Sequence, residues 1–239
     1  MSAGAIRTKG TALTDVLLVH GGWHGGWCWD AVAHRLAGLG HRVLAPTLSG
    51  LGDRSHLCAS TVGLDTHITD VVNAATWGGL DDFVLCGHSY GGMVISGAAE
   101  HLVGRIRGLV YVDAFLPANG QSCTDLASGP PPARDSLVPP PPVEAFGIAS
   151  ATARARVQRL LTPHPANTLL DRVALTDARD RIGRKTYILA TSSSTPDFAR
   201  AHASIAADPA WRTFGLPTGH HPMTDAPDAL VDIILESAR

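Results

Sequence analysis

The chain has 239 residues, 45% of them hydrophobic, and a formal net charge of −2 at pH 7. This length suits one α/β domain with a full hydrophobic core and does not require a second domain, and the near-neutral charge gives no electrostatic reason to expect binding to nucleic acid or to an anionic membrane. Since no apolar run is long enough to span a bilayer and the four cysteines form no C-x-x-C pair, we expect a soluble cytoplasmic protein with free thiols.

The first predicted strand, residues 16–19, is a continuous apolar run that leads into a glycine-rich loop, His20-Gly21-Gly22-Trp23-His24-Gly25-Gly26-Trp27. Glycine at a strand end lets the backbone approach a ligand closely. When a serine nucleophile lies on a later turn between strand and helix, an H-G-G loop of this kind donates one N–H group to the oxyanion hole. We assign that N–H group to Gly22. Trp23 and Trp27 are candidate walls of a substrate pocket.

Three more elements precede the central motif. Apolar residues at helical spacing predict a helix over residues 29–39 that ends at Gly40, a residue type common just after a helix. A strand over residues 42–45 follows, then a loop rich in turn-forming residues, 46–55, and a helix over residues 64–77. These alternating elements are typical of a parallel sheet covered by helices.

The motif Gly87-His88-Ser89-Tyr90-Gly91 lies between an apolar run typical of a strand, residues 83–86, and a run of small residues typical of a helix, 92–99. The order strand, G-x-S-x-G, helix is that of a nucleophile elbow, in which a sharp turn lifts the serine hydroxyl off the sheet edge. Ser89 is therefore the candidate nucleophile. Because the residue after the nucleophile donates the second N–H group of the oxyanion hole in such enzymes, we assign that group to Tyr90.

The next predicted strand, residues 108–112, ends at Asp113. The carboxyl ends of parallel strands meet at one edge of the sheet, and such folds place their ligands and catalytic groups there. This carboxylate would share that edge with the serine of the elbow. Asp113 is therefore a candidate catalytic acid.

Residues 117–185 interrupt the alternation of strands and helices. Two runs of prolines lead into predicted helices over residues 151–161 and 166–175. We interpret the segment as a cap inserted over the site. The predicted division is thus a core of residues 1–116 and 186–239 and a cap of residues 117–185.

The last part of the chain returns to alternating strands and helices. A strand over residues 187–190 precedes a helix whose first position is Pro196, and a last strand covers residues 211–216. A closing helix carries an apolar face that docks on the sheet, formed by Leu230, Ile233 and Ile234. The predicted fold class is α/β, with a mainly parallel sheet of about six strands and helices on both faces.

Together these motifs resemble the α/β-hydrolase family, and more narrowly its branch of plant methylesterases, hydroxynitrile lyases and small bacterial esterases. The resemblance covers nearly the whole chain and rests on residues 20–29, 87–93, 112–117 and 218–220. It implies the α/β-hydrolase fold with a small helical cap. It also implies that His220 is the catalytic histidine, because the order of serine, acid and histidine along the chain is then that of the family.

Two departures from the family pattern affect the expected chemistry. Hydroxynitrile lyases of this branch have a threonine and a lysine where this chain has Gly21 and His221, so cyanohydrin cleavage would lack its polar groups. The family places its acid after the penultimate strand, where this chain has Ser192-Ser193-Ser194. Three alternatives follow: Asp113 is the acid, Asp197 is the acid, or a hydroxyl alone orients the imidazole. We favour Asp113 because it lies at a strand end.

The expected chemistry is acyl transfer, in which His220 takes the proton of Ser89 and the serine oxygen attacks the carbonyl of an ester or thioester. A weakly oriented histidine suits a thiolate leaving group, which needs little protonation, better than an alkoxide. With water as the acceptor the enzyme would be an esterase or thioesterase, and with another hydroxyl or an amine it would be an acyltransferase. The predicted pocket favours an apolar or aromatic acyl group and has as its walls Trp23, Trp27, Phe115 and Phe146.

Two other functions are open from the sequence. One is C–C bond cleavage like that of a hydroxynitrile lyase, and the other is a non-catalytic protein that binds small molecules and whose triad has decayed. We expect no cofactor and no metal. The expected partner is a small-molecule acyl substrate, either free or held as a thioester on a carrier, and a homodimer is compatible with the sequence.

Overall fold

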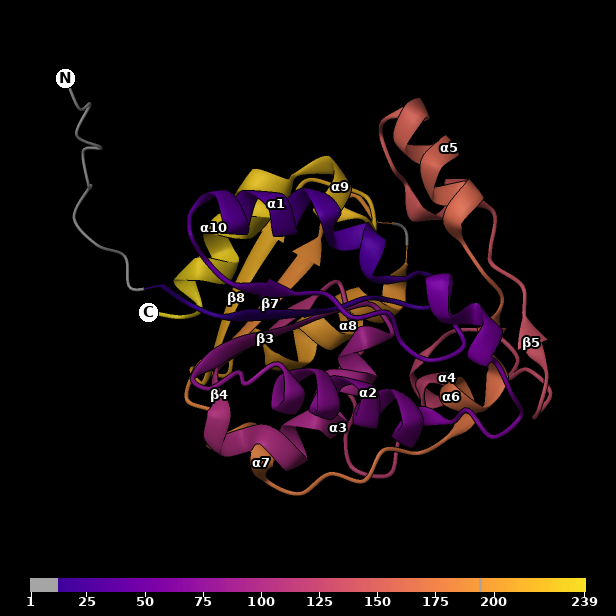
Figure 1. Cartoon of the computed structure of the whole chain (residues 1–239), viewed down its shortest axis with the longest axis horizontal. Coiled ribbons are helices and arrows are strands. Elements are labelled where there is room, and N and C mark those ends of the chain that lie inside the picture. The colour runs from indigo at the N-terminus through magenta and orange to yellow at the C-terminus, as the bar shows by residue number, and fades with distance from the viewer. Residues whose placement is uncertain (1–12, 194) are drawn as a thin grey trace.

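The computed structural model describes residues 13–193 and 195–239. Its centre is a six-stranded sheet of order β2-β1-β3-β4-β7-β8, in which every neighbouring pair is parallel (Figure 1). The strands are β1 (Val16–Val19), β2 (Val43–Leu44), β3 (Phe83–His88), β4 (Ile106–Val112), β7 (Lys185–Ala190) and β8 (Trp211–Leu216). The expected α/β class and mainly parallel sheet are confirmed.

Helices cover both faces of this sheet, as Figure 1 shows. The larger helices are α1 (Asp30–Gly38), α2 (Leu64–Trp77), α3 (Gly91–Leu102), α8 (Pro196–Ile205) and α10 (Pro227–Glu236). Successive side chains of a strand point to opposite faces, so Leu17 belongs to the core cluster under α2 and α3, whereas Leu18 belongs to the cluster under α1 and α10. Because both faces are buried, the strands are continuous apolar runs rather than alternating ones.

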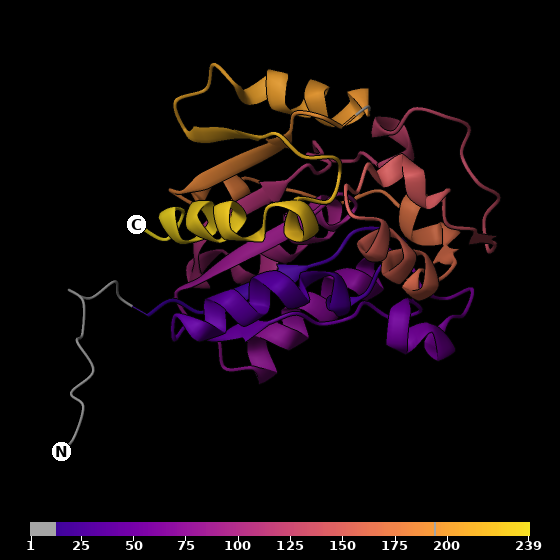
Figure 2. The ribbon, with the colours of Figure 1, turned by 90° about the horizontal axis from the view of Figure 1, so that it is seen from above.

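The segment from residue 117 to residue 184, hereafter the cap segment, connects β4 to β7, whose first residue, Lys185, was expected to end the cap. Figure 2 shows most of it gathered at the end of the sheet away from the C-terminus. It contains α4 (Cys123–Leu126), β5 (Leu137–Val138), α5 (Ala151–Leu160), β6 (His164–Pro165), α6 (Ala166–Leu170) and α7 (Ala178–Arg181). The strands β5 and β6 pair with each other in antiparallel fashion, while α7 packs against α3 beside the main sheet.

Some predicted elements are shorter in the structure. The helix expected over residues 166–175 ends at Leu170, because the next residues pair with other parts of the chain: Asp171 accepts a hydrogen bond from the N–H group of Leu64, and the N–H group of Val173 donates to Gln121. The edge strand expected over residues 42–45 is also shorter and consists only of β2, Val43–Leu44.

Within the described ranges, no helix has both the length and the apolar character needed to cross a membrane.

Candidate active site

The elbow motif forms the turn between β3 and α3. Ser89 has a φ of 54°, a left-handed conformation that is uncommon for a residue with a side chain. The glycines around it allow the turn to be this tight: a Cβ atom on Gly87 would lie 2.7 Å from the carbonyl oxygen of Gly91, and one on Gly91 would lie 2.8 Å from that of His20. The hydroxyl-bearing residue is therefore held in a strained conformation where a sheet edge meets a helix N-terminus.

The glycine-rich loop after β1 lies directly against this elbow. A Cβ atom on Gly21 would be 2.9 Å from Cβ of Ser89, and one on Gly22 would be 3.9 Å from Cβ of Tyr90. The structure thus brings together Gly22 and Tyr90, the two residues predicted to form the oxyanion hole. Within residues 13–193 and 195–239, neither of their main-chain N–H groups donates a hydrogen bond. Both donors are available to an oxygen atom of a ligand.

His220 follows β8, and its imidazole Nδ1–H donates a hydrogen bond of 2.6 Å to Oδ2 of Asp113. Asp113 is fully buried and has a φ of 42°, so it too occupies a left-handed turn at a strand end. Its second carboxylate oxygen, Oδ1, accepts the N–H group of Ala190 at 3.1 Å. The carboxylate is therefore held by groups on two neighbouring elements, and it fixes which nitrogen of the imidazole carries the proton.

The two alternatives for an acid have other partners. The Asp197 carboxylate accepts hydrogen bonds from the main-chain N–H and the hydroxyl of Ser128, at 3.0 and 2.7 Å, and pairs with Arg200. It therefore ties the first turn of α8 to the cap segment. In the serine loop, the hydroxyl of Ser193 accepts the N–H group of Thr195 at 3.4 Å, while Ser194 lies outside the described residues. Of the three arrangements considered, the geometry brings Asp113 to the histidine.

Two phenylalanine rings stack on the imidazole of His220. Phe198 lies nearly parallel to it, with centroids 4.8 Å apart and an interplanar angle of 5°, and Phe146 lies at 6.3 Å and 13°. Phe146 was expected as a pocket wall, and its ring also contacts that of His24. Phe198 was not selected from the sequence, although its place in the first turn of a helix after a parallel strand puts it at the edge where the site lies.

The other predicted pocket residues have different surroundings. Trp23 connects the loop after β1 to the cap segment: its main-chain N–H donates to Nδ1 of His164 at 3.2 Å, and its indole N–H donates to the carbonyl of Val138 at 3.1 Å. Trp27 packs against the small apolar cluster of the cap segment that includes Phe146. Phe115 lines a cavity of about 190 Å³ between the cap segment and α8, together with Leu116, Leu126, Asp197, Arg200, Ala201 and Ser204.

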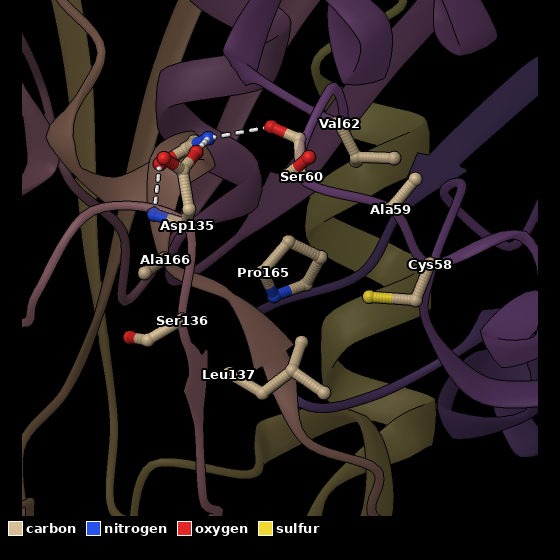
Figure 3. Close-up of a pocket in the computed structure, with 10 residues that line it drawn as sticks. Cys58, Ala59, Ser60, Val62, Asp135, Ser136, Leu137, Pro165 and Ala166 are labelled. Carbon is tan, nitrogen blue, oxygen red and sulfur yellow. Dashed lines mark hydrogen bonds between the residues drawn. The ribbon is translucent and has the colours of Figure 1, made fainter.

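A second cavity, of about 160 Å³, opens between the cap segment and the loop that follows β2. Figure 3 shows Cys58, Leu137 and Pro165 around it. The polar side chains here bond to one another or to the backbone: the Asn167 amide donates to the carbonyl of Ser60 and to the Asp135 carboxylate. This pocket is part of the contact between cap segment and core.

Buried histidines surround the site. They are His20, His24, His67, His88, His164 and His221. Burial disfavours the charged imidazolium, and it lowers the pKa of His20 to about 3 and the pKa values of His24 and His67 to about 4. Among the described residues, no group of three or more His, Cys, Asp or Glu side chains is arranged to hold a metal ion. These histidines are neutral hydrogen-bonding groups of the interior.

His221, which occupies the position of the hydroxynitrile-lyase lysine, is one of them. Its Nε2 lies 2.8 Å from Nε2 of His24. Because the Nδ1–H of His24 donates to the carbonyl of Gly22, Nε2 of His24 is an acceptor. The hydrogen bonds therefore require His221 to donate its Nε2–H and to accept the Thr224 hydroxyl at Nδ1. Because its side chain is fully buried and both nitrogens are engaged, His221 does not present a charge to a substrate as a lysine would.

The six-stranded parallel sheet with a serine elbow at its edge is the architecture of an α/β-fold hydrolase. Residues 16–233 match the sequence profile of the "Alpha/beta hydrolase family". The chain therefore belongs to the alpha/beta hydrolase family, as the motifs predicted.

The relatives within this family are named as esterases and hydrolases. The chain is 36% identical to a carbendazim hydrolyzing esterase from Nocardioides sp. (strain SG-4G) over 237 residues, which cover 92% of this chain and 98% of that protein. It is 26% identical to the putative methylesterase 11, chloroplastic, of Arabidopsis thaliana, over 93% of this chain but only 63% of that protein. An extracellular alpha/beta-hydrolase from a Paenibacillus species has the same fold, with a TM-score of 0.80, 24% identity, and coverage of 95% of this chain and 99% of that one. The protein is a hydrolase.

Proposed function

We propose that this hydrolase is a serine esterase that works through an acyl-enzyme. The observation that carries the proposal is the hydrogen bond between His220 and the buried Asp113, at the sheet edge that also bears Ser89. A histidine whose Nδ1–H is held in this way has Nε2 free to accept a proton from a serine hydroxyl. The left-handed conformation of Ser89 and the elbow around it support the assignment of the nucleophile.

In the proposed acylation step, Ser89 Oγ forms a bond to the carbonyl carbon of the substrate while its proton passes to Nε2 of His220. The carbonyl oxygen becomes negative and is stabilised by the N–H groups of Gly22 and Tyr90. The bond to the leaving group then breaks as the imidazolium returns its proton to the departing oxygen. In the second half of the reaction, water replaces the leaving group and the same steps release the acid and regenerate the serine.

The contact between Asp113 and His220 favours an oxygen ester as the substrate. The sequence suggested a thioester because the usual acid is absent, and a weakly held histidine protonates an alkoxide poorly. An imidazolium bonded to a buried carboxylate is well oriented, so this reason for preferring a thioester, and with it for a carrier, no longer applies. We propose hydrolysis of a small-molecule ester.

The acyl group in this proposal is apolar or aromatic. Phe198 and Phe146 lie against the imidazole of His220, and apolar surfaces beside the reacting groups favour apolar ligands. The cavity beside α8 does not bear on this preference, because neither Ser89 nor His220 is among the residues that line it. Carbendazim, the compound in the name of the Nocardioides esterase, is a reasonable first compound to test beside simple esters.

A fluorophosphonate probe tests the proposal directly, because it reacts only with an activated serine. We expect labelling of the purified protein, located by mass spectrometry at Ser89, and loss of p-nitrophenyl butyrate hydrolysis in proportion to labelling. Ser89→Ala should abolish both, while Ser55→Ala, which changes an exposed serine of the loop after β2, should label like the wild type. A protein that binds esters but is never labelled at Ser89 would be a binding protein rather than an esterase.

A further inference from the structure

His220 makes further contacts besides its hydrogen bond to the proposed acid. Its Nδ1–H is fixed by Asp113, and its main-chain carbonyl accepts the Nε2–H of His88 at 2.7 Å. These bonds fix one edge of the imidazole and the backbone behind it. They leave the plane of the ring free to rock about the bond to Asp113.

The stacked phenylalanines restrict this remaining motion. Phe198 and Phe146 are only 3% and 5% exposed, so both rings are themselves held in place by packing. Each lies nearly parallel to the imidazole, at centroid distances within the range of aromatic stacking. Rocking of the His220 ring would drive it into Phe198, the nearer of the two rings.

The backbone around Phe146 is fastened to the loop of His220. A Cβ atom on Gly219 would lie 2.8 Å from Cα of Gly147, so the two chains touch where both residues are glycine. Gly147 also has a φ of 63°, which glycine adopts without strain. Two residues on, the N–H group of Ala149 donates to the Asp225 carboxylate at 3.2 Å. The cap segment therefore holds Phe146 at a fixed place relative to His220.

We propose that Phe198 and Phe146 are positioning residues for His220: they hold the plane of its imidazole, and Phe198 also stabilises the positive charge that the ring acquires when it takes the serine proton. The face of an aromatic ring attracts a cation that lies over it. Phe198 supplies this face from α8, with its centroid 4.8 Å from that of the imidazole. Phe146, at 6.3 Å, acts by restricting the position of the ring, so docking of the cap segment contributes to the activity of the histidine. The inference rests on the proposed acyl-enzyme function.

This role predicts which substrates depend on the phenylalanines. An alkoxide leaves only if the imidazolium delivers its proton along a defined direction, whereas p-nitrophenolate is a stable anion that leaves with little help. A less well-held imidazolium therefore slows an alkyl ester more than a p-nitrophenyl ester of the same acid. General damage to the fold or to the acyl pocket slows both equally.

The experiment compares kcat/KM for ethyl butyrate and p-nitrophenyl butyrate in Phe198→Leu, Phe198→Tyr and Phe146→Leu. Leucine keeps most of the apolar volume but has no aromatic face, and tyrosine keeps the face. Phe214→Leu is the matched control. Phe214 is a partly buried phenylalanine of β8 that packs against the core cluster under α1 and α10. The melting temperature of each variant reports whether it is folded.

We expect Phe198→Leu to lower kcat/KM for ethyl butyrate by about three- to tenfold more than for p-nitrophenyl butyrate. Phe198→Tyr should restore the wild-type ratio, Phe146→Leu should show a smaller effect of the same kind, and Phe214→Leu should leave the ratio unchanged. Equal losses for both esters in the leucine variants would overturn the inference while leaving the acyl-enzyme intact. Full activity of Ser89→Ala would instead overturn the proposed function itself.

Discussion

The change Asp113→Asn tests the proposed acid most directly, because it keeps the shape of the side chain and removes its charge. Two donors converge on this carboxylate, Nδ1–H of His220 at 2.6 Å and the N–H group of Ala190 at 3.1 Å. An asparagine has only one acceptor oxygen. If that oxygen faces Ala190, the amide N–H₂ points at His220 and forces the proton onto Nε2, where it blocks proton transfer from Ser89. If it faces His220, the amide N–H₂ opposes the N–H of Ala190 inside the protein.

Either orientation also removes the negative charge that stabilises the imidazolium. The equivalent change in a serine protease lowers the rate about 10⁴-fold, and we expect a loss of about 10² to 10⁴ in kcat/KM here. Stopped-flow release of p-nitrophenol would measure acyl-enzyme formation, with Asp197→Asn as the matched variant. Asp197 bonds to Ser128 and Arg200 rather than to the histidine, so its variant should lose less than about threefold. Near-wild-type acylation in Asp113→Asn would refute the assignment of Asp113 as the acid. A severe loss in Asp197→Asn alone would assign the acid to Asp197 instead.

Three further predictions follow from the site and its surroundings. His220→Ala should reduce esterase turnover about as severely as Ser89→Ala, since removal of either member disables the unit, and a mild effect in steady-state assays would contradict its role as the base. Gly21→Ala should abolish activity or soluble expression, because its methyl group would lie 2.9 Å from Cβ of Ser89, and a fully active variant would show that the loop can shift. The free energy of unfolding, measured with urea, should fall by about 1.4 kcal/mol per pH unit for each of His24 and His67 as the pH is lowered from about 6.5 towards 4. Burial lowers the pKa values of these two imidazoles to about 4, so the unfolded chain binds protons that the folded chain does not. Constant stability between pH 7 and 5 would mean that these imidazoles are solvated.

The features predicted well are those that depend on short stretches of sequence. A buried parallel strand is a continuous apolar run wherever it occurs, and the elbow requires glycines at fixed offsets from Ser89, so both are visible without knowledge of the rest of the chain. The helix over residues 166–175 was predicted too long because its end depends on distant partners. Asp171 there bonds to the N–H group of Leu64, more than a hundred residues earlier, and no local pattern encodes that contact.

The contacts made across the cap segment were the least predictable. Phe146 is an ordinary apolar residue of a proline-rich region, and only the docking of that region brings it against His220. Trp23 likewise bonds to Val138 and His164, residues far away along the chain. An apolar composition indicates that such residues are buried, but it does not say whether they face a substrate or another side chain.

The position of the acid follows from the register of the sheet. In the family pattern the acid comes from the loop after the strand equivalent to β7, whereas Asp113 ends β4, the neighbouring strand. These two strands pair in parallel with Val112 opposite Ile188, so the residues just beyond them lie side by side at the sheet edge. The N–H group of Ala190, at the end of β7, bonds directly to the Asp113 carboxylate. A carboxylate at the end of β4 therefore reaches a histidine after β8, and a serine loop after β7 is compatible with a histidine that has an acidic partner.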